Sequence, residues 1–137
     1  MNKYIYIAIK EAKKSLKTAD IPVGAVIIEN NKVIAKSHNT REKNKLITGH
    51  AEINAINKAA KKKKTWHLNN CELYVTLEPC KMCKSVIEQA KISKIYYAAK
   101  NTSEPSNNEK NKILIEKIND NGLSEQLVKN FFQKIRK

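Results

Sequence analysis

The sequence predicts one α/β domain with three layers, α/β/α, in which a mixed sheet of about five strands is flanked by helices. Strand-like β-branched runs alternate along the chain with segments whose apolar residues recur every three or four positions, as in amphipathic helices. The 137 residues, 41% of them hydrophobic, suffice for one core, and no internal repeat or Pro/Gly-rich linker divides them. We therefore expect a single domain over residues 1–137.

The chain begins with a predicted helix and a predicted hairpin. Residues 3–17 carry apolar side chains at spacings of three and four, which predicts a helix. Two β-branched runs, residues 23–29 and 32–36, flank Asn30 and Asn31. Because asparagine tolerates left-handed backbone conformations, these two residues favour a tight turn between antiparallel strands. The apolar positions of the predicted helix are Ile5, Ala8, Ile9, Ala12 and Leu16.

The middle of the chain is predicted to alternate between helix and strand. The polar residues 38–49 indicate a loop, and residues 50–62 a helix. A strand over residues 73–77, a helix over 80–90 and a strand over 92–98 follow. The helix over residues 50–62 is expected to bury Ile53, Ile56 and Ala60.

The C-terminal part of the chain carries weaker signals. Residues 100–111 are polar or charged apart from one proline, which indicates a loop. Residues 112–118 fit either a helix or a strand, and we favour a strand because the run is short and β-branched. A closing helix is predicted by apolar residues at every fourth position, namely Leu123, Leu127, Phe131 and Ile135.

The chain is strongly basic, with a net charge of +14 from 27 basic and 13 acidic residues. One interpretation is a polyanionic partner such as nucleic acid. The other is compositional drift, since lysine is abundant beside many asparagines and isoleucines. Arginine, the better reader of bases and phosphates, occurs only at Arg41 and Arg136. Charge alone leaves both interpretations open.

No segment is typical of a membrane span or a signal peptide. The longest unbroken aliphatic stretch is Ala25–Ile28, and the apolar run at the N-terminus is too short for a secretory signal. We therefore expect a cytoplasmic location. In such a reducing compartment, the pair Cys80 and Cys83 is a candidate for metal binding or catalysis rather than for a disulfide.

Three residues have the types and spacing of a catalytic zinc site. Cys80 and Cys83 stand three residues apart at the start of a predicted helix, which places both sulfurs on one face, and Pro79 fits the first turn. The positive end of the helix dipole favours the thiolates that a metal needs. His50 can supply a third ligand. One imidazole and two thiolates would hold one Zn²⁺ and leave a fourth position for water, as catalytic sites do.

Glu52 follows His50 by two residues, and a carboxylate beside metal-bound water can accept and return a proton. A Cys-x-x-Cys pair alone also fits redox chemistry or half of a structural zinc site, and a lone His-x-Glu is a weak signal. The joint pattern of His50–Glu52 and Pro79–Cys83 is far more specific, and it predicts a zinc-dependent deaminase.

The other histidines and the third cysteine are assigned structural positions. His38 and His67 lack the spacing of metal ligands and are expected to lie in loops. Cys71 stands at the start of a predicted strand, away from the other cysteines, and is expected to be a small buried apolar residue.

Beyond these motifs, the chain resembles the bacterial tRNA-specific adenosine deaminases of the cytidine-deaminase-like superfamily. The zinc motifs indicate the superfamily, whereas the segment around Asn39 and the Phe-Phe tail point within it to tRNA. The resemblance is close over roughly residues 1–100 and loose beyond. The segments that carry it are Ile21–Ile27, His38–Glu42, Gly49–Ile53, Leu73–Cys83 and Phe131–Arg136.

The resemblance implies a cytidine-deaminase-like fold and hydrolysis of adenosine to inosine at the wobble position of a tRNA anticodon. Zinc-activated hydroxide would attack C6 of the base, with Glu52 as the proton shuttle. Homodimers that cradle the anticodon stem-loop are also implied. By family position, Asn39 would hydrogen-bond the target nucleotide, and Val23 and Leu77 would pack against its base. Asn101 would lie beside the neighbouring ribose, while Phe132 and Arg136 would touch flanking nucleotides. Phe131 is expected in the core instead.

Two departures from the family pattern are visible. Family members usually have a full helix between the last two strands, whereas residues 100–111 are short and polar here. Asn101 stands where an aspartate is expected.

Two other functions share parts of this pattern. A zinc-dependent deaminase of a free base or nucleoside, of the guanine or cytosine type, would have the same metal motif. The run Lys61–Lys64 and the basic tail favour a polyanionic substrate, although each fits a solvated helix end equally well. A non-catalytic, zinc-stabilised RNA-binding subunit would be expected to lack the glutamate, whereas Glu52 is present.

Overall fold

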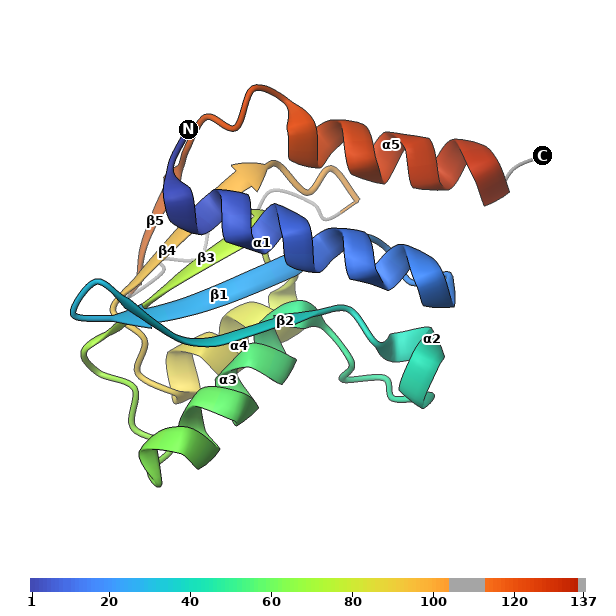
Figure 1. The fold of residues 1–137 in the computed structure, drawn as a ribbon. Helices are drawn as coiled ribbons and strands as arrows, with labels where there is room; N and C mark the ends of the chain where they lie inside the picture. The colour runs from blue at the N-terminus through green and yellow to red at the C-terminus, as the bar shows by residue number, and fades with distance from the viewer. Residues whose placement is uncertain (104–112, 136–137) are drawn as a thin grey trace.

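A computed structural model of the chain describes residues 1–103 and 113–135. It contains a mixed five-stranded sheet between two layers of helices, as the sequence predicts (Figure 1). Helix α1 (Lys3–Lys14) and helix α5 (Leu123–Ile135) cover one face, while α3 (Ala51–Lys63) and α4 (Lys81–Gln89) cover the other. The strands, in spatial order, are β2 (Lys32–His38), β1 (Gly24–Glu29), β3 (Cys71–Leu77), β4 (Lys94–Ala99) and β5 (Leu114–Lys117).

The direction of the strands brings several chain segments to one edge of the sheet. Strand β1 is antiparallel to β2 and β3, whereas β3, β4 and β5 run parallel. The start of β1 therefore lies beside the ends of β3 and β4, where Leu77 pairs with Ala99. Helices α3 and α4 both begin at this edge, and Val23, Leu77 and Asn101 gather there. Ligand sites of α/β proteins commonly form at such carboxyl ends.

The sheet has one apolar core on each of its two faces. The larger one packs α3 and α4 against the sheet and includes Cys71, which is fully buried as predicted. The smaller one lies under α1 and contains Ile5 and Ala8. At Gly24 the backbone of β1 approaches α1 so closely that a Cβ atom would lie 1.8 Å from the carbonyl oxygen of Ala8.

Several predictions about buried faces need correction. Leu16 is 45% exposed, because α1 ends at Lys14 and a 3₁₀ turn, η1 (Ser15–Thr18), changes the phase of the helix. In α3, Ala59 is buried and Ala60 is half-buried, so the buried stripe is shifted by one residue at its end. Phe131 is half-buried and belongs to neither core, since α5 buries only Ser124.

The segment predicted as one loop over residues 38–49 has more structure than expected. His38 is the last residue of β2, where its Nδ1 lies 3.2 Å from Oε1 of Glu11, so it is not in a loop. Helix α2 (Arg41–Asn44) follows within the segment. Its first turn is held by the buried Asp20, whose carboxylate accepts hydrogen bonds from the backbone N–H groups of residues 42 and 43. The capping residue lies more than 20 positions away, so local sequence carries no signal for this helix.

The strand favoured over residues 112–118 is confirmed as β5, and it runs parallel to β4. His67 lies in the loop between α3 and β3, as predicted. Of the predicted 100–111 loop, the structure describes residues 100–103. The remainder of that loop and Arg136 lie outside the described residues. Among the described residues, no helix is both long and apolar enough to cross a membrane.

Candidate active site

His50, Cys80 and Cys83 come together at the starts of two helices. His50 is the N-cap of α3 and Cys80 is the N-cap of α4, while Cys83 lies in the first turn of α4. The Nδ1 atom of His50 is 3.7 Å from Sγ of Cys80 and 3.3 Å from Sγ of Cys83. One ligand atom from each residue lies within 4.8 Å of the other two, so a single metal ion can contact all three.

The three side chains share protons through hydrogen bonds. Hydrogen bonding from the Cys83 thiol lowers the pKa of Cys80 to about 3, and the same bond together with burial raises the pKa of Cys83. A hydrogen bond with Cys80 also raises the pKa of His50. One thiolate is therefore favoured at neutral pH, and the positive end of the helix dipole favours it further.

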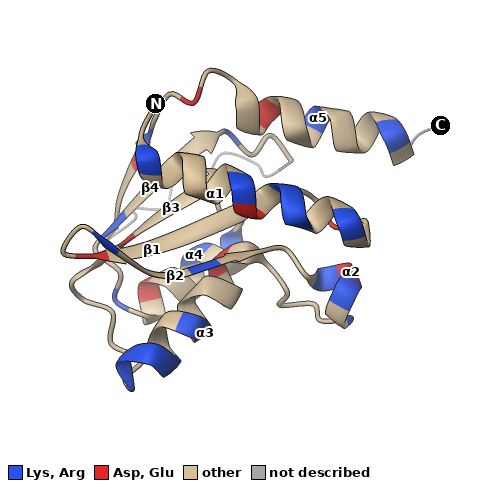
Figure 2. Ribbon diagram, viewed as in Figure 1, with Lys and Arg blue, Asp and Glu red and all other residues tan. Residues whose placement is uncertain are grey.

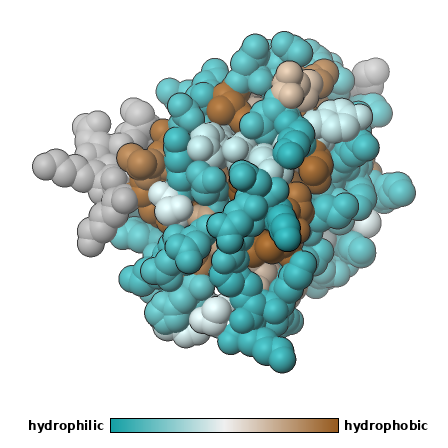
Figure 3. Space-filling view, turned by 60° about the vertical axis from the view of Figure 1, so that its left-hand side comes forward, coloured by the Kyte–Doolittle hydropathy of each residue, from teal (hydrophilic) through white to brown (hydrophobic). Residues whose placement is uncertain are grey.

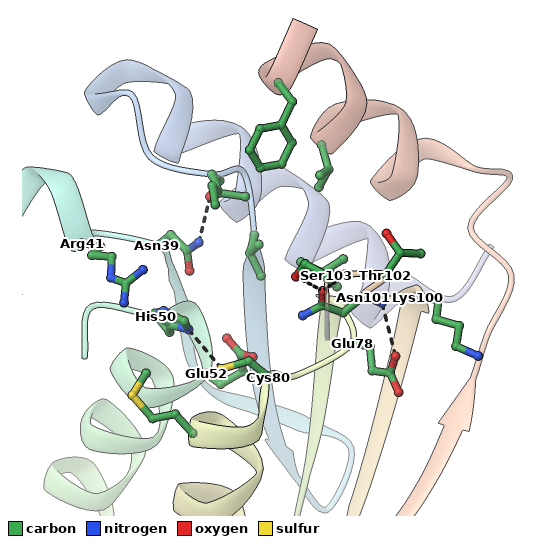
Figure 4. Close-up of a pocket in the computed structure, with 16 residues that line it drawn as sticks. Asn39, Arg41, His50, Glu52, Glu78, Cys80, Lys100, Asn101, Thr102 and Ser103 are labelled. Atoms are coloured by element: carbon green, nitrogen blue, oxygen red, sulfur yellow. Dashed lines mark hydrogen bonds between the residues drawn. The ribbon is translucent and has the colours of Figure 1, made fainter. Parts of the chain in front are cut away.

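Glu52 lies in the first turn of α3, next to these ligands (Figure 4). Its side chain is buried, with 3% of the residue exposed, and desolvation raises its pKa to about 7. A carboxyl group with such a pKa is close to half-protonated at neutral pH, so it can both accept and donate a proton.

These residues open into a pocket of about 450 Å³, a size typical of small-molecule sites. His50, Glu52 and Cys80 line it, whereas Cys83 is buried behind them. The pocket also brings together five of the six residues that sequence assigned to substrate. They are Val23, Asn39, Leu77, Asn101 and Phe132 (Figure 4).

Asn39 makes structural hydrogen bonds besides lining the pocket. Its Oδ1 accepts from the backbone N–H of Ala51 at 2.8 Å, and its Nδ2 donates to the carbonyl of Ile21 at 3.0 Å. His50 uses its side chain in the metal site and makes no cap hydrogen bond, so Asn39 caps α3 from outside the helix. One hydrogen of Nδ2 remains for a ligand in the pocket.

Asn101 lies at the opposite side of the pocket from Asn39, two residues after the end of β4 (Figure 4). Its backbone N–H donates to Oε1 of Glu78 at 3.2 Å. Its Oδ1 accepts from both the N–H and the Oγ of Ser103, at 3.1 and 2.6 Å. Asn101 therefore lies at the pocket, and its acceptor oxygen is already hydrogen-bonded to Ser103.

The pocket also contains residues that the sequence did not single out. Arg41 lines it from α2, and Lys100 lines it after β4. Arg41 is one of only two arginines, and this rarity was an available signal. Lys100 is one of many lysines, and nothing in its local sequence marks it. The other additional lining residues are Ile21, Glu78, Met82, Thr102, Ser103 and Val128.

A mixed sheet with an imidazole, a thiol and a buried carboxylate at one pocket, and a second thiol buried next to them, defines a deaminase-type hydrolytic site. The chain belongs to the MafB19-like deaminase family, whose model matches residues 1–136.

The chain is similar to curated tRNA-specific adenosine deaminases. It is 41% identical to that of Aquifex aeolicus (strain VF5) over 96 residues, which cover 70% of this chain and 64% of the relative. It is 42% identical to that of Bacillus subtilis (strain 168), over 70% of this chain and 60% of the relative. The chain thus matches less than two thirds of the length of these relatives.

Solved structures show the same fold. A structure from a study of A-to-I editing by tRNA:A34 deaminases at the wobble position has a TM-score of 0.77 and 29% identity, over 84% of this chain and 96% of that chain. A guanine deaminase from Bacillus subtilis has a TM-score of 0.69 and 28% identity, over 99% of this chain and 94% of that chain.

Proposed function

We propose that this chain is a zinc-dependent deaminase that hydrolyses adenosine to inosine and ammonia at the wobble position of a tRNA anticodon. The observation that carries this proposal is the cluster of His50, Cys80 and Cys83 beside the buried Glu52, at one pocket. The similarity to tRNA-specific adenosine deaminases supports the choice of substrate.

The donor set fits zinc. One imidazole nitrogen and two thiol sulfurs are ligands that Zn²⁺ prefers, and three protein ligands leave one position of a tetrahedral site open. Bound there, the ion would supply a water molecule of lowered pKa as the nucleophile. Cys80 and Cys83 would both bind as thiolates, which offsets the charge of the ion.

Glu52 would move the protons of the reaction. Its pKa of about 7, raised by burial, suits a group that accepts a proton from water and passes it to the purine ring and then to the leaving amine. Water adds at C6, the C6–N bond breaks, and ammonia and the 6-oxo base are the products.

The walls of the pocket suit a base extruded from an RNA loop. Val23 and Leu77 would pack against the faces of the base, and the free Nδ2 hydrogen of Asn39 would donate to it. Phe132 would stack on a flanking nucleotide. Asn101 would lie beside the neighbouring ribose and donate to it from Nδ2, since its Oδ1 already accepts two hydrogen bonds from Ser103.

The charge of the chain supports RNA as the partner. Arg41 and Lys100 line the pocket that holds the target nucleotide, and the net charge of +14 favours a polyanion. A homodimer in the cytoplasm that cradles the anticodon stem-loop is part of this proposal, as is a phosphate contact from Arg136.

Deamination of a free base is the second candidate. The likeness to a guanine deaminase extends over 99% of this chain, farther than the 84% of the tRNA deaminase structure. A small neutral base, however, requires no basic surface, and the charge of +14 favours the RNA substrate.

A substrate panel tests the proposal. Zinc-loaded protein is incubated separately with a tRNA transcript carrying adenosine at the first anticodon position, with adenosine, with cytidine and with guanine. Mass spectrometry reads the products. We expect inosine from the tRNA and little turnover of the small molecules. Guanine converted faster than tRNA would establish the second candidate instead.

A further inference from the structure

The end of α3 that lies far from the pocket presents an exposed aromatic pair. Trp66 is 60% exposed, although large aromatic side chains normally bury much of their surface. Its ring stacks on that of His67, with the centroids 3.8 Å apart and an interplanar angle of 26°. Trp66 is also the only tryptophan of the chain.

A run of lysines, Lys61–Lys64, precedes this pair in the chain. Lys61, Lys62 and Lys64 are exposed, whereas Lys63 turns to the sheet and pairs with Glu29 at 2.7 Å. Within the part of the chain that the structure describes, none of the three exposed lysines forms an ion pair. Figure 2 shows this basic turn at the end of α3. We call Lys61, Lys62, Lys64, Trp66 and His67 the Trp66 surface.

The backbone beneath the Trp66 surface is firmly held. The N–H of Thr65 donates to the carbonyl of Ala60, and its Oγ1 accepts from the N–H of His67, both at 3.1 Å. Leu68 is fully buried, and its N–H donates to the carbonyl of Ala90 at 2.8 Å. A ligand that stacks on Trp66 therefore has little backbone entropy to remove.

We propose that the Trp66 surface is a second RNA contact, where an unpaired base stacks on Trp66 and neighbouring phosphates meet Lys61, Lys62 and Lys64. Aromatic platforms among basic residues are the usual way to bind single-stranded nucleic acid. Exposed lysines without acidic partners on a chain of charge +14 oppose contact with a second copy. The proposal rests on the proposed function for the identity of the RNA.

The contact is separate from the pocket. Helix α3 has 13 residues, and at 1.5 Å per residue its two ends lie about 20 Å apart. His50 stands at one end and the Trp66 surface at the other. The nucleotides held here are therefore distinct from the nucleotide that enters the pocket, and they add affinity for a large RNA.

The single tryptophan permits a direct test. Its fluorescence is measured while a tRNA transcript with adenosine at the first anticodon position is added to zinc-loaded protein. We expect saturable quenching, because stacking on a base places the indole against the nucleotide. Binding measured in parallel by anisotropy of labelled tRNA, with no change in tryptophan emission, would overturn the proposal. Emission that changes on dilution of RNA-free protein but not on adding RNA would overturn it too, and would indicate a subunit contact.

Matched variants separate the Trp66 surface from general charge. K61A/K62A/K64A and the control K3A/K13A/K17A, on α1 and the following turn η1, each remove three exposed lysines. We expect the first variant to lower the slope of log affinity against log salt by about 2, and the control to lower it much less. Equal losses in both variants would contradict a local contact. W66A should weaken tRNA binding at least about fivefold, with W66F retaining most of it.

The test of this second RNA contact can be separated from the test of the proposed deaminase activity. Inosine formation is measured on the same wild-type preparation. Deamination of tRNA without a response of Trp66 would reject the second contact alone. A response of Trp66 without deamination would reject the proposed activity and leave the RNA contact standing.

Discussion

At the scale of single residues, the metal ligands occupy positions that helices normally use for capping. His50 and Cys80 are both N-caps, and neither makes a side-chain cap hydrogen bond. Ser, Thr, Asp or Asn would stabilise these positions by roughly 1 kcal/mol each. The two helix starts therefore lack a stabilising cap hydrogen bond because the site needs metal ligands there. At α3, Asn39 compensates in part by accepting a hydrogen bond from the N–H of Ala51.

Two variants test whether Glu52 moves the proton while the other residues hold the metal. Glu52→Gln should retain about one zinc per chain and lose at least about 10²-fold in rate, since an amide cannot shuttle the proton. Cys83→Ala should lose both metal and activity, because two ligands hold zinc poorly. Elemental analysis and initial rates provide the measurements. Near-normal turnover by Glu52→Gln would show that another group moves the proton.

How much the sequence could predict also differs from residue to residue. The metal site could be predicted from the spacing of His50, Glu52, Cys80 and Cys83, because residues at a helix start have a fixed local geometry. Arg41 lines the pocket from α2, whose start is held by Asp20, 22 positions from residue 42. Such long-range contacts leave no local pattern, and neither does the position of Lys100 after β4.

At the scale of secondary-structure elements, the distance between α1 and the sheet is set by Gly24. Gly24→Ala would place a Cβ atom 1.8 Å from the carbonyl oxygen of Ala8, so the helix must move. We expect the free energy of unfolding to fall by about 3 kcal/mol or more. Gly122→Ala is the control, because nothing lies within 4 Å of its Cβ position. Its positive φ of 76° should cost about 1 kcal/mol. Thermal unfolding followed by circular dichroism should show this difference, and equal effects would contradict the close approach.

A buried carboxylate connects α1 to β2. Burial alone would raise the pKa of Glu11, but hydrogen bonds from Lys14 at 2.6 Å and with His38 at 3.2 Å outweigh it and lower the pKa below 4.5. Because the folded state holds this carboxylate charged more strongly than the unfolded chain does, the stabilisation is present above the unfolded pKa. It is lost as the pH falls through the folded pKa.

Glu11→Gln should therefore lower the free energy of unfolding by about 1–3 kcal/mol at pH 7 and by less at pH 3. Thermal unfolding at both pH values provides the measurement. Glu125→Gln, which breaks a well-exposed pair with Lys129, is the control and should change stability by less than about 0.5 kcal/mol. A deficit of Glu11→Gln that persists unchanged at pH 3 would contradict this role for the charge.

Elements with clear periodicity were predictable, and elements that depend on partners were not. Strands β1 to β4 and helices α3 and α4 follow from β-branched runs and helical spacing. In α5, the every-fourth-residue pattern predicted the helix correctly but assigned Phe131 to a core that α5 does not enter. Periodicity reports which residues share a face, and it does not report how deeply that face is buried.

At the scale of the whole molecule, the sheet topology explains how distant segments form one site. Antiparallel β1 places Val23 at the edge where the parallel strands β3 and β4 end, and α3 and α4 deliver their N-termini to the same edge. Polar and apolar regions intermingle on the face in Figure 3, where teal side chains surround several brown patches. Figure 2 shows Lys and Arg on α1, α2, α3 and α5, so the basic charge is spread over several elements, which suits a large polyanionic substrate.

The central claim is that this site converts one particular adenosine of a tRNA. The most direct measurement is sequencing of a tRNA transcript, with adenosine at the first anticodon position, after incubation with zinc-loaded protein, since inosine is read as guanosine. We predict an A-to-G change at that position alone, which is abolished by Glu52→Gln. No change at the first anticodon position, or changes at adenosines throughout the transcript, would contradict the account.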